Sequence, residues 1–223
     1  KKAADNGLHI AYNNLGIVYE NIGDDETAGT YYLKGAKLGI ANSQYNIARF
    51  MIYDLGGFNN KLKAFGWLNK SVKQNHIQAT RLLANVYDKG IGVPQNYLEA
   101  RKLYISAANQ GDSLAMNGLA IMYYNGNGVV KSISKAKKWH LKAANLGMLF
   151  SINLLADIYL EEEDYNEAEK WYIKGDSLGD IYSTNDLGRL YSNKNWSKYD
   201  YSKAIEWYIK ASNLGDDYAM DEL

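Results

Sequence analysis

The side chains that most often carry chemistry are few in this chain. Its three histidines, His9, His76 and His140, stand far apart, and none belongs to an H-E-x-x-H or other metal-binding spacing. The chain has no cysteine, which excludes disulfides, thiolate zinc sites and cysteine nucleophiles. The acidic run at residues 161–164 lacks the alternating ligands and the glycine of a calcium loop, so we interpret it as a solvated turn.

Two glycine pairs, Gly90-x-Gly92 and Gly126-x-Gly128, could suggest a phosphate-binding loop. Each pair lacks the third glycine of such a loop, and no strand precedes either one. The sequence has no G-x-S-x-G motif and no set of Ser, His and Asp that its spacing brings together. We therefore expect no catalytic residue, no metal site and no cofactor. The protein is predicted not to be an enzyme, and a hydrolase is the least favoured alternative.

The composition narrows the class of partner. The 223 residues include 25 Lys and Arg against 25 Asp and Glu, so the formal net charge is zero. This balance argues against a nucleic-acid partner and against docking on an anionic membrane surface, because both need excess positive charge. No apolar run approaches the ~20 residues that span a bilayer, so no membrane insertion is expected. The single proline suits long helices, because proline breaks a helix interior.

A short pattern that ends in glycine recurs along the chain, as in KAANLG at residues 142–147. Its final position, here called the marker, recurs every 32 or 36 residues, and asparagine replaces glycine once. Asparagine is the next-best residue for the left-handed position that ends a helix, so each marker predicts a helix C-terminus. The markers are Gly7, Gly39, Asn75, Gly111, Gly147, Gly179 and Gly215.

Other residue types keep a fixed offset from the marker. A small residue follows it by four positions, an aliphatic residue by eight, a small residue by nine, and usually tyrosine by twelve. These offsets fall on one face of a helix, and the small residue at offset nine lets a second helix approach closely. The aliphatic positions are Leu15, Ile47, Leu83, Leu119, Leu155, Leu187 and Leu223.

The second half of each unit carries an alanine followed, three and four residues later, by bulky side chains. Trp171-Tyr172 shows the common form, and Trp139-His140 places histidine where most units have tyrosine, which predicts a packed role for His140. Each unit is thus a helix A, a turn and a helix B, and the turn is longer in the 36-residue units. One pair cannot bury its apolar stripe, so successive pairs are expected to stack into an all-α solenoid.

The pattern resembles the Sel-one-like repeat (SLR) family, a relative of the tetratricopeptide repeats. The family reads roughly A-x3-L-G-x2-Y-x2-G-x-G-V and then K-A-x2-W-Y-x-K-A-A-x2-G, and the best matches are residues 115–129, 135–147 and 203–215. The resemblance implies a right-handed α–α superhelix of about six helix-turn-helix repeats. Residues 1–223 are expected to form one solenoid domain with partial repeats at both ends, the first of which is the end of a helix B that stops at Gly7. The expected repeats are 8–39, 40–75, 76–111, 112–147, 148–179 and 180–215.

In tetratricopeptide relatives, helix A lines the concave surface. Aligning the two patterns on Leu-Gly-x2-Tyr places offsets 3, 6, 10 and 13 on that surface. Aromatic residues, arginine and asparagine are frequent there and lysine is absent, which is typical of protein interfaces. The carboxamides could hydrogen-bond a peptide backbone. The predicted partner-binding residues are Asn42, Tyr45, Arg49, Arg81, Asn85, Asn117, Tyr124, Phe150, Asn153, Asp157, Tyr182, Asn185 and Arg189.

We therefore predict a non-enzymatic scaffold or adaptor that binds a protein or peptide partner through its curved repeat surface. Neither a nucleic acid nor a small-molecule substrate is expected. Family members generally act as adaptors in bacterial envelope, secretion and host-interaction systems and in eukaryotic ER quality control. Two alternatives follow: an immunity-type protein that neutralises a secreted toxin, and an assembly factor of an envelope or secretion complex. The resemblance favours a bacterial protein located in the periplasm or outside the cell over a cytoplasmic one.

Overall fold

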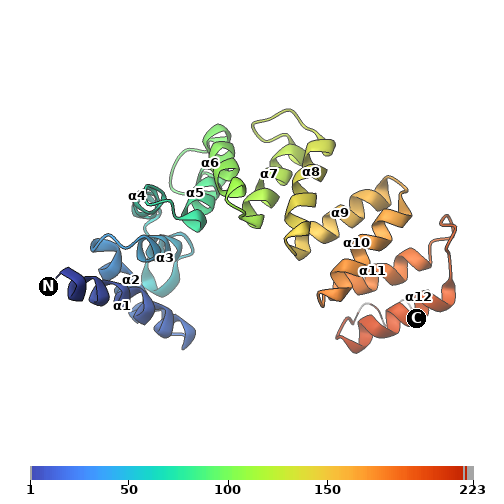
Figure 1. The fold of residues 1–223 in the computed structure, drawn as a ribbon, viewed down its shortest axis with the longest axis horizontal. Coiled ribbons are helices and arrows are strands. Elements are labelled where there is room, and N and C mark those ends of the chain that lie inside the picture. The colour runs from blue at the N-terminus through green and yellow to red at the C-terminus, as the bar shows by residue number, and fades with distance from the viewer. Residues whose placement is uncertain (1, 218, 220–223) are drawn as a thin grey trace. The chain divides into compact units, whose positions relative to one another are not determined.

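The computed structural model describes residues 2–217 and 219, with side chains from residue 11 onward. These residues form helices and turns, with no strand among them (Figure 1). The aliphatic position at Leu223 lies outside the described residues. The elements are α1 (Lys2–Asn21), α2 (Asp25–Lys37), α3 (Ala41–Ile52), the short 3-10 helix η1 (Leu55–Gly57), α4 (Lys61–Val72), α5 (Ile77–Lys89), α6 (Tyr97–Asn109), α7 (Ser113–Asn125), α8 (Ile133–Asn145), α9 (Leu149–Glu161), α10 (Tyr165–Ser177), α11 (Ile181–Tyr191) and α12 (Tyr201–Asn213).

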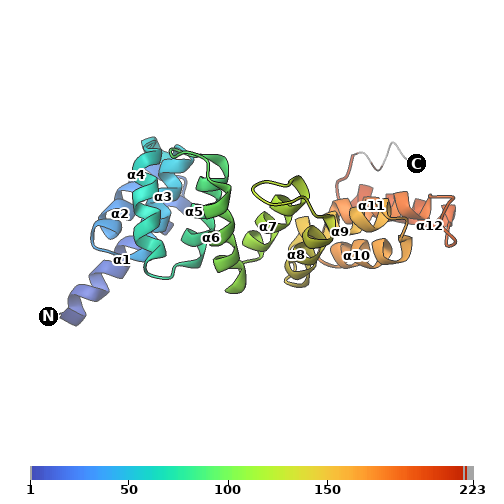
Figure 2. The ribbon, with the colours of Figure 1, turned by 90° about the horizontal axis from the view of Figure 1, so that it is seen from above.

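The chain divides into two compact units. Unit 1 comprises the residues up to 119 together with 127–129, and unit 2 comprises 120–126 together with residues from 130 onward. In unit 1, each helix from α1 to α6 packs against the next one along the chain, and the same holds from α8 to α12 in unit 2. The pairing of α3 with α4 and of α11 with α12 can be followed in both views (Figures 1 and 2).

The markers end helices as predicted. Gly39 has φ of 90° and Asn75 has φ of 61°, and the markers at 111, 147, 179 and 215 also have positive φ. The residue after each of these markers donates its backbone N–H to the carbonyl five positions earlier, as His76 does to Ser71. This hydrogen bond defines a Schellman-type helix C-terminus, which confirms that asparagine replaces glycine for a conformational reason.

Gly7 is the exception, and the expected helix end there is wrong. The helix α1 runs without a break from Lys2 to Asn21 and therefore passes through Gly7. Glycine inside a helix costs only about 1 kcal/mol relative to alanine, so it does not end a helix by itself.

Each helix B begins at a side chain that caps it. Asp24 accepts a hydrogen bond from the N–H of Thr27 at 3.0 Å, and Asn60 accepts one from Lys63 at 2.9 Å. Such a cap contributes about 1 kcal/mol, because it satisfies an N–H that has no partner within the helix. The full set of helix B caps is Asp24, Asn60, Asn96, Ser132, Asp164 and Asp200.

The long turns fold back onto the start of the preceding helix B. A Cβ atom at Gly92 would lie 2.7 Å from Cβ of Lys61, and one at Gly128 would collide with Tyr97, the first residue of α6. These glycines therefore allow close approach of the backbone, which confirms that the Gly-x-Gly pairs belong to turns. In the last repeat Trp196 takes this place, with its buried ring centred 6.5 Å from that of Tyr165, the first residue of α10.

The core lies between the two helices of each pair. The aliphatic positions from Ile47 to Leu187 are at most 3% exposed, whereas Leu15 in the first repeat is 38% exposed. A Cβ at Gly16 would come within 2.9 Å of three ring atoms of Tyr32, so the small residue at offset nine does make room for the side chain of helix B. His140 is 2% exposed, which confirms that it is a packed residue in the tyrosine position.

Candidate partner-binding site

The structure places all the predicted partner-binding residues on the helices at position A, namely α3, α5, α7, α9 and α11. None of them is fully buried. The most accessible large side chains are Tyr182, Phe150 and Tyr124, which are 74%, 54% and 42% exposed. Asn42 and Arg189 are also exposed, and the other predicted residues are half-buried.

A polar hollow of about 320 Å³ opens in unit 1 on the A helices α1, α3 and α5. The offset argument anticipated most of its lining, and it missed Asn46 and His76. Both are sequence neighbours of positions that the repeat pattern had already identified, because Asn46 follows Tyr45 and His76 follows the marker Asn75. The lining residues are Asn13, Ile17, Asn42, Tyr45, Asn46, His76 and Gln78.

His76 fixes the geometry of this hollow. Its Nδ1 accepts a hydrogen bond from the N–H of Ala79 at 3.1 Å and thereby caps α5. The neutral ring must then hold its proton on Nε2, which lies 2.9 Å from Oδ1 of Asn42 and donates to it. The ring also stacks on Tyr45, with centroids 5.1 Å apart. Burial lowers the pKa of His76 below its usual value, which favours this neutral form.

Several hydrogen-bonding groups in the hollow have no recorded partner among the described residues. Asn42 uses its oxygen for His76, which leaves its amide N–H groups available. Asn46 donates to Oδ1 of Asn13 at 3.1 Å, which leaves its own oxygen as an acceptor. Gln78 is exposed. The hollow thus offers both donors and acceptors, as an extended peptide backbone requires.

Other predicted residues join one repeat to the next. The offset-6 side chain of one A helix reaches the residue that caps the next A helix, an arrangement here called the repeat joint. Arg81 pairs with Asp112 at 3.2 Å, and Asn153 donates to Asp180 at 2.9 Å. Asn185 donates to Asp216, the residue after the marker Gly215, at 2.8 Å. The sequence placed these side chains on the A-helix face, but it did not predict that each of them contacts the following repeat.

Asn117 occupies offset 6 on α7. Oδ1 of Asn117 is buried and has no hydrogen-bond partner among the described residues. Leaving a buried acceptor unpaired costs roughly 1–3 kcal/mol.

Arg49 belongs to an ion-pair network between the first two repeats. Its Nη2 lies 2.6 Å from Oε1 of Glu20, and the hydroxyl of Tyr32 donates to Oε2 of the same carboxylate at 2.7 Å. Burial acts to raise the pKa of Glu20, but the hydrogen bonds from Arg49 and Tyr32 outweigh it and hold that pKa below its usual value. Asp157 similarly accepts a hydrogen bond from Tyr172 at 2.6 Å.

These contacts bear on how the predicted residues could act. Arg49, Arg81, Asn153, Asp157 and Asn185 already have partners within the protein, so their first role is to position the A helices. Their contact with an external partner stays a prediction. Asn42, Phe150 and Tyr182 lie on the predicted face and are exposed, so they are accessible to a partner.

The side chains of His140 and Ser151 are in contact. Nδ1 of His140 lies 3.4 Å from Oγ of Ser151. Both side chains are buried, no carboxylate contact to His140 is recorded among the described residues, and the serine hydroxyl is within 3.5 Å of Sδ of Met148. A substrate would have no access to this pair, so it is a packing contact rather than a nucleophile and its base.

Within the described part of the chain, no group of three or more His, Cys, Asp or Glu side chains could hold a metal ion. None of the described helices is both long enough and apolar enough to cross a membrane.

The fold and this site define a solenoid of helix pairs, a class whose members are generally non-catalytic and bind other proteins. The family model described as Sel1 repeat matches residues 41–76, 77–112, 113–148 and 181–216. The model described as tetratricopeptide repeat matches residues 9–38 and 151–178, the two repeats with the shorter turn. The chain therefore belongs to the Sel1 repeat family, and the predicted resemblance is confirmed.

Solved structures and a curated relative agree with this assignment. A Sel1 repeat protein from Oxalobacter formigenes has a TM-score of 0.79 and 25% identity, covering 92% of this chain and 87% of that one. A protective antigen with an SLR fold, present in uropathogenic Escherichia coli strains, has a TM-score of 0.74 and 26% identity, covering 98% and 49%. A sel1-like repeat-containing protein of Acanthamoeba polyphaga mimivirus is 30% identical over 125 residues, which are 54% of this chain and 22% of that protein. The chain thus spans about a fifth of that relative. The structural similarities confirm the predicted all-α repeat fold.

Proposed function

We propose that the protein is an interaction scaffold that binds an extended peptide segment of a protein partner along the exposed face of its A helices. The observation that carries the proposal is the polar hollow of unit 1, where the carboxamides of Asn42 and Asn46 use only part of their hydrogen-bonding capacity within the protein and stand beside a fixed His76. Paired donors and acceptors of this kind match the main chain of a peptide, which alternates N–H and C=O groups.

The exposed aromatic residues of unit 2 support the same proposal. Phe150 and Tyr182 occupy the same repeat position, offset 3, on α9 and α11. Aromatic side chains bury much apolar area at a low cost in conformational entropy, and they are enriched among residues that dominate binding energy. They would act as anchors for partner side chains, while the preformed helix array lowers the ordering cost of binding.

The test is affinity capture of the partner from the source organism, followed by a binding measurement with purified components. The double variant Phe150→Ala and Tyr182→Ala is expected to weaken binding at least about tenfold, since such anchors are typically worth more than 1 kcal/mol each. Tyr199→Ala with Tyr201→Ala is the matched control, because these residues are 40% and 56% exposed and lie at the start of α12. If the control weakens binding and the test variant does not, the A-helix face is the wrong surface.

A second variant examines the hollow. Asn42→Ala with Gln78→Ala removes two accessible carboxamides that line it, and it is expected to weaken binding without changing helicity. Charge reversal at Arg49 or Arg81 is a poorer test, because it would break the contacts to Glu20 and Asp112 within the protein.

The identity of the captured partner then assigns the finer role within this proposal. A secreted toxin whose activity is abolished in the complex would make the protein immunity-type. A component of an envelope or secretion complex would make it an assembly factor. Turnover of a small molecule, lost on substitution of one ionisable residue, would instead favour the hydrolase alternative.

A further inference from the structure

Positive charge gathers on helix α8 although the chain as a whole is neutral. Helix α8 carries four lysines and no acidic residue within its 13 positions. Helix α10, in the equivalent position of the next repeat, mixes acidic and basic residues. Helix α4 has three lysines and no acidic residue, so α8 has to be distinguished from it by what surrounds its lysines.

Three of these lysines form a stripe on the surface of α8. Lys135, Lys138 and Lys142, here called the lysine stripe, are all exposed, and no ion pair is recorded for them among the described residues. Their spacing of three and four residues places them on one face of the helix. Like charges at this spacing repel, and each pair destabilises the helix by roughly 0.2–0.5 kcal/mol. An anionic partner would relieve that repulsion.

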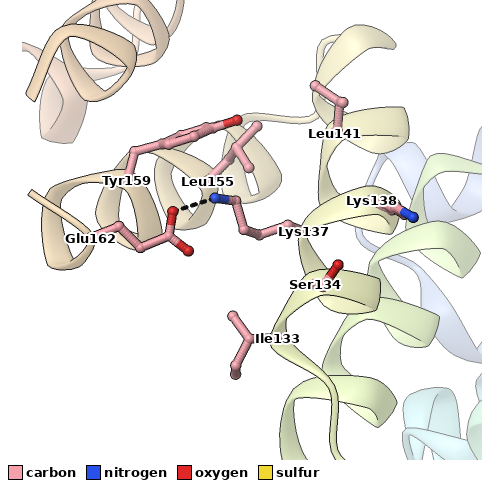
Figure 3. Close-up of a pocket in the computed structure, with 8 residues that line it drawn as sticks. All are labelled: Ile133, Ser134, Lys137, Lys138, Leu141, Leu155, Tyr159 and Glu162. Atoms are coloured by element: carbon pink, nitrogen blue, oxygen red, sulfur yellow. Dashed lines mark hydrogen bonds and ion pairs between the residues drawn. The ribbon is translucent and has the colours of Figure 1, made fainter. Parts of the chain in front are cut away.

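Lys137 is different, because it is held within the protein. Its Nζ lies 2.5 Å from Oε2 of Glu162 and 3.9 Å from the ring centre of Tyr159. Figure 3 shows Lys137 pointing toward α9 while Lys138 points away from it. Glu162 thus neutralises Lys137 and leaves the lysine stripe as the accessible charge.

Apolar hollows flank the stripe. The first, of about 400 Å³, lies between α8 and α9, and Ile133, Leu141, Leu155 and Tyr159 form its apolar part (Figure 3). The second, of about 370 Å³, is lined by Trp139 and Leu141 together with the lysine stripe. Lys138 and Leu141 line both hollows, so they form the ridge that separates them.

We propose that this face of α8 binds an acidic peptide segment that also carries apolar side chains. The carboxylates would pair with the lysine stripe, and leucine or aromatic side chains would enter the hollow beside Leu141. The surface belongs to a helix B, so it is separate from the A-helix face and does not rest on the function proposed above.

A peptide fits better than a nucleic acid for two reasons. The apolar parts of the hollows, formed by residues such as Ile133, Trp139 and Leu141, suit leucine or phenylalanine side chains, which a nucleic acid lacks. The acidic turn at residues 161–164 also follows α9 directly, and Glu162 stands at the rim of the first hollow. A continuous phosphate backbone would meet this negative charge beyond the short basic stripe, because nucleic-acid surfaces need extended positive charge.

The experiment measures binding of a fluorescent synthetic peptide, in which glutamate pairs alternate with leucine pairs, by fluorescence anisotropy. The variant carrying Lys135→Glu, Lys138→Glu and Lys142→Glu is expected to bind roughly tenfold more weakly or worse, since three exposed charge pairs contribute about 0.2–1 kcal/mol each before repulsion is added. Affinity of the unchanged protein should fall as salt is raised.

The control variant makes the same charge change on α4 through Lys61→Glu, Lys63→Glu and Lys70→Glu. It is matched at Lys70, which lies 4.3 Å from the Trp67 ring centre as Lys142 lies 4.2 Å from that of Trp139, and it differs at Lys61, whose Nζ pairs with Asp54 at 3.7 Å. Peptide binding by this control should change less than about twofold, since rim charges far from a site mainly affect long-range steering. Equal weakening by both variants would overturn the proposal, because total charge alone would then explain it.

The apolar part is tested separately with Leu141→Ser, which leaves the charge unchanged at a residue that is 39% exposed. This variant should weaken binding about threefold to tenfold, in line with the apolar area removed. Tight binding of a polyglutamate peptide, or of a single-stranded oligonucleotide, at the affinity of the leucine-containing peptide would show a general polyanion surface and would refute the proposal. Circular dichroism of each variant checks that the helices remain intact.

Discussion

Acid should destabilise this protein through His140. The imidazole is 2% exposed and packs in a position that most repeats fill with tyrosine. Burial lowers its pKa from the usual 6.5 to about 4, because the charged ring would lose its hydration. No carboxylate contact to the ring is recorded among the described residues, so no opposite charge compensates for this loss.

The size and sign of the effect follow from the two pKa values. Below about pH 6.5 the unfolded chain takes up a proton at His140, whereas the folded protein does so only near pH 4. The free energy of unfolding therefore falls as the pH is lowered through this window and changes no further below it. Each pH unit is worth about 1.4 kcal/mol, so the total is on the order of 3 kcal/mol, with roughly 2 kcal/mol lost between pH 7 and pH 5.

Urea unfolding of the protein and of His140→Phe at both pH values measures this contribution. The phenyl ring keeps an aromatic in the slot and does not titrate, so the difference between the two proteins should change by roughly 2 kcal/mol between pH 7 and pH 5. His76 and the carboxylates titrate in both proteins and cancel in that difference. A difference that is independent of pH would refute the reasoning, because His140 would then have an ordinary pKa in the folded state.

Three further substitutions test the packing between helices and repeats. Gly16→Ala should lower the free energy of unfolding by about 1–3 kcal/mol, because its Cβ would press on the Tyr32 ring. Gly66→Ala, whose Cβ would have nothing within 4 Å, should be neutral or stabilising by up to about 1 kcal/mol. Thermal unfolding compares the two variants, and similar shifts in both would contradict the clash at Gly16. Asp180→Ala should cost about 2 kcal/mol in urea unfolding, because it removes both the cap of α11 and the partner of Asn153, and Asp180→Asn should recover most of the cap. Trp196→Ala should cost about 3–5 kcal/mol and loosen the turn before α12, which hydrogen exchange would detect as faster exchange around Asp200; unchanged exchange there would contradict its covering role.

The helix pairs could be predicted because the signals are local. A marker ends a helix by adopting a positive φ at its own position, and Asn75 has such a φ. Gly7 has the same sequence signal, and the helix passes through it. The sequence signal alone therefore does not separate Gly7 from the markers that end a helix. The reading of the whole chain as one solenoid domain stays a prediction, and a single unfolding transition reported by probes in both units would support it.

The binding face was predicted in position but only partly in role. Arg81 and Asn153 at offset 6 and Asn42 at offset 3 belong to the same predicted face, yet the first two contact the next repeat and Asn42 lines a hollow. The distinguishing residue lies about thirty positions away, at the cap of the next A helix. Reading each offset-6 residue together with the residue after the next marker would have found the joint. No such pairing signals the lysine stripe, which depends on which lysines find acidic partners after folding.

The repeat joint also determines which copies of the repeat could be duplicated in evolution. Asn185 reaches the residue that opens the following copy, and its own repeat opens with Asp180. A tandem duplication of residues 180–215 would therefore bring its own matching partner and form a complete connection at once. The repeat at 148–179 opens with Met148, which offers no polar acceptor. If this repeat were duplicated, Asn153 in the second copy would still bond to Asp180, but Asn153 in the first copy would face a methionine and lose its acceptor. Growth of the array by unequal recombination should thus preserve the repeat joint at some copies and weaken it at others.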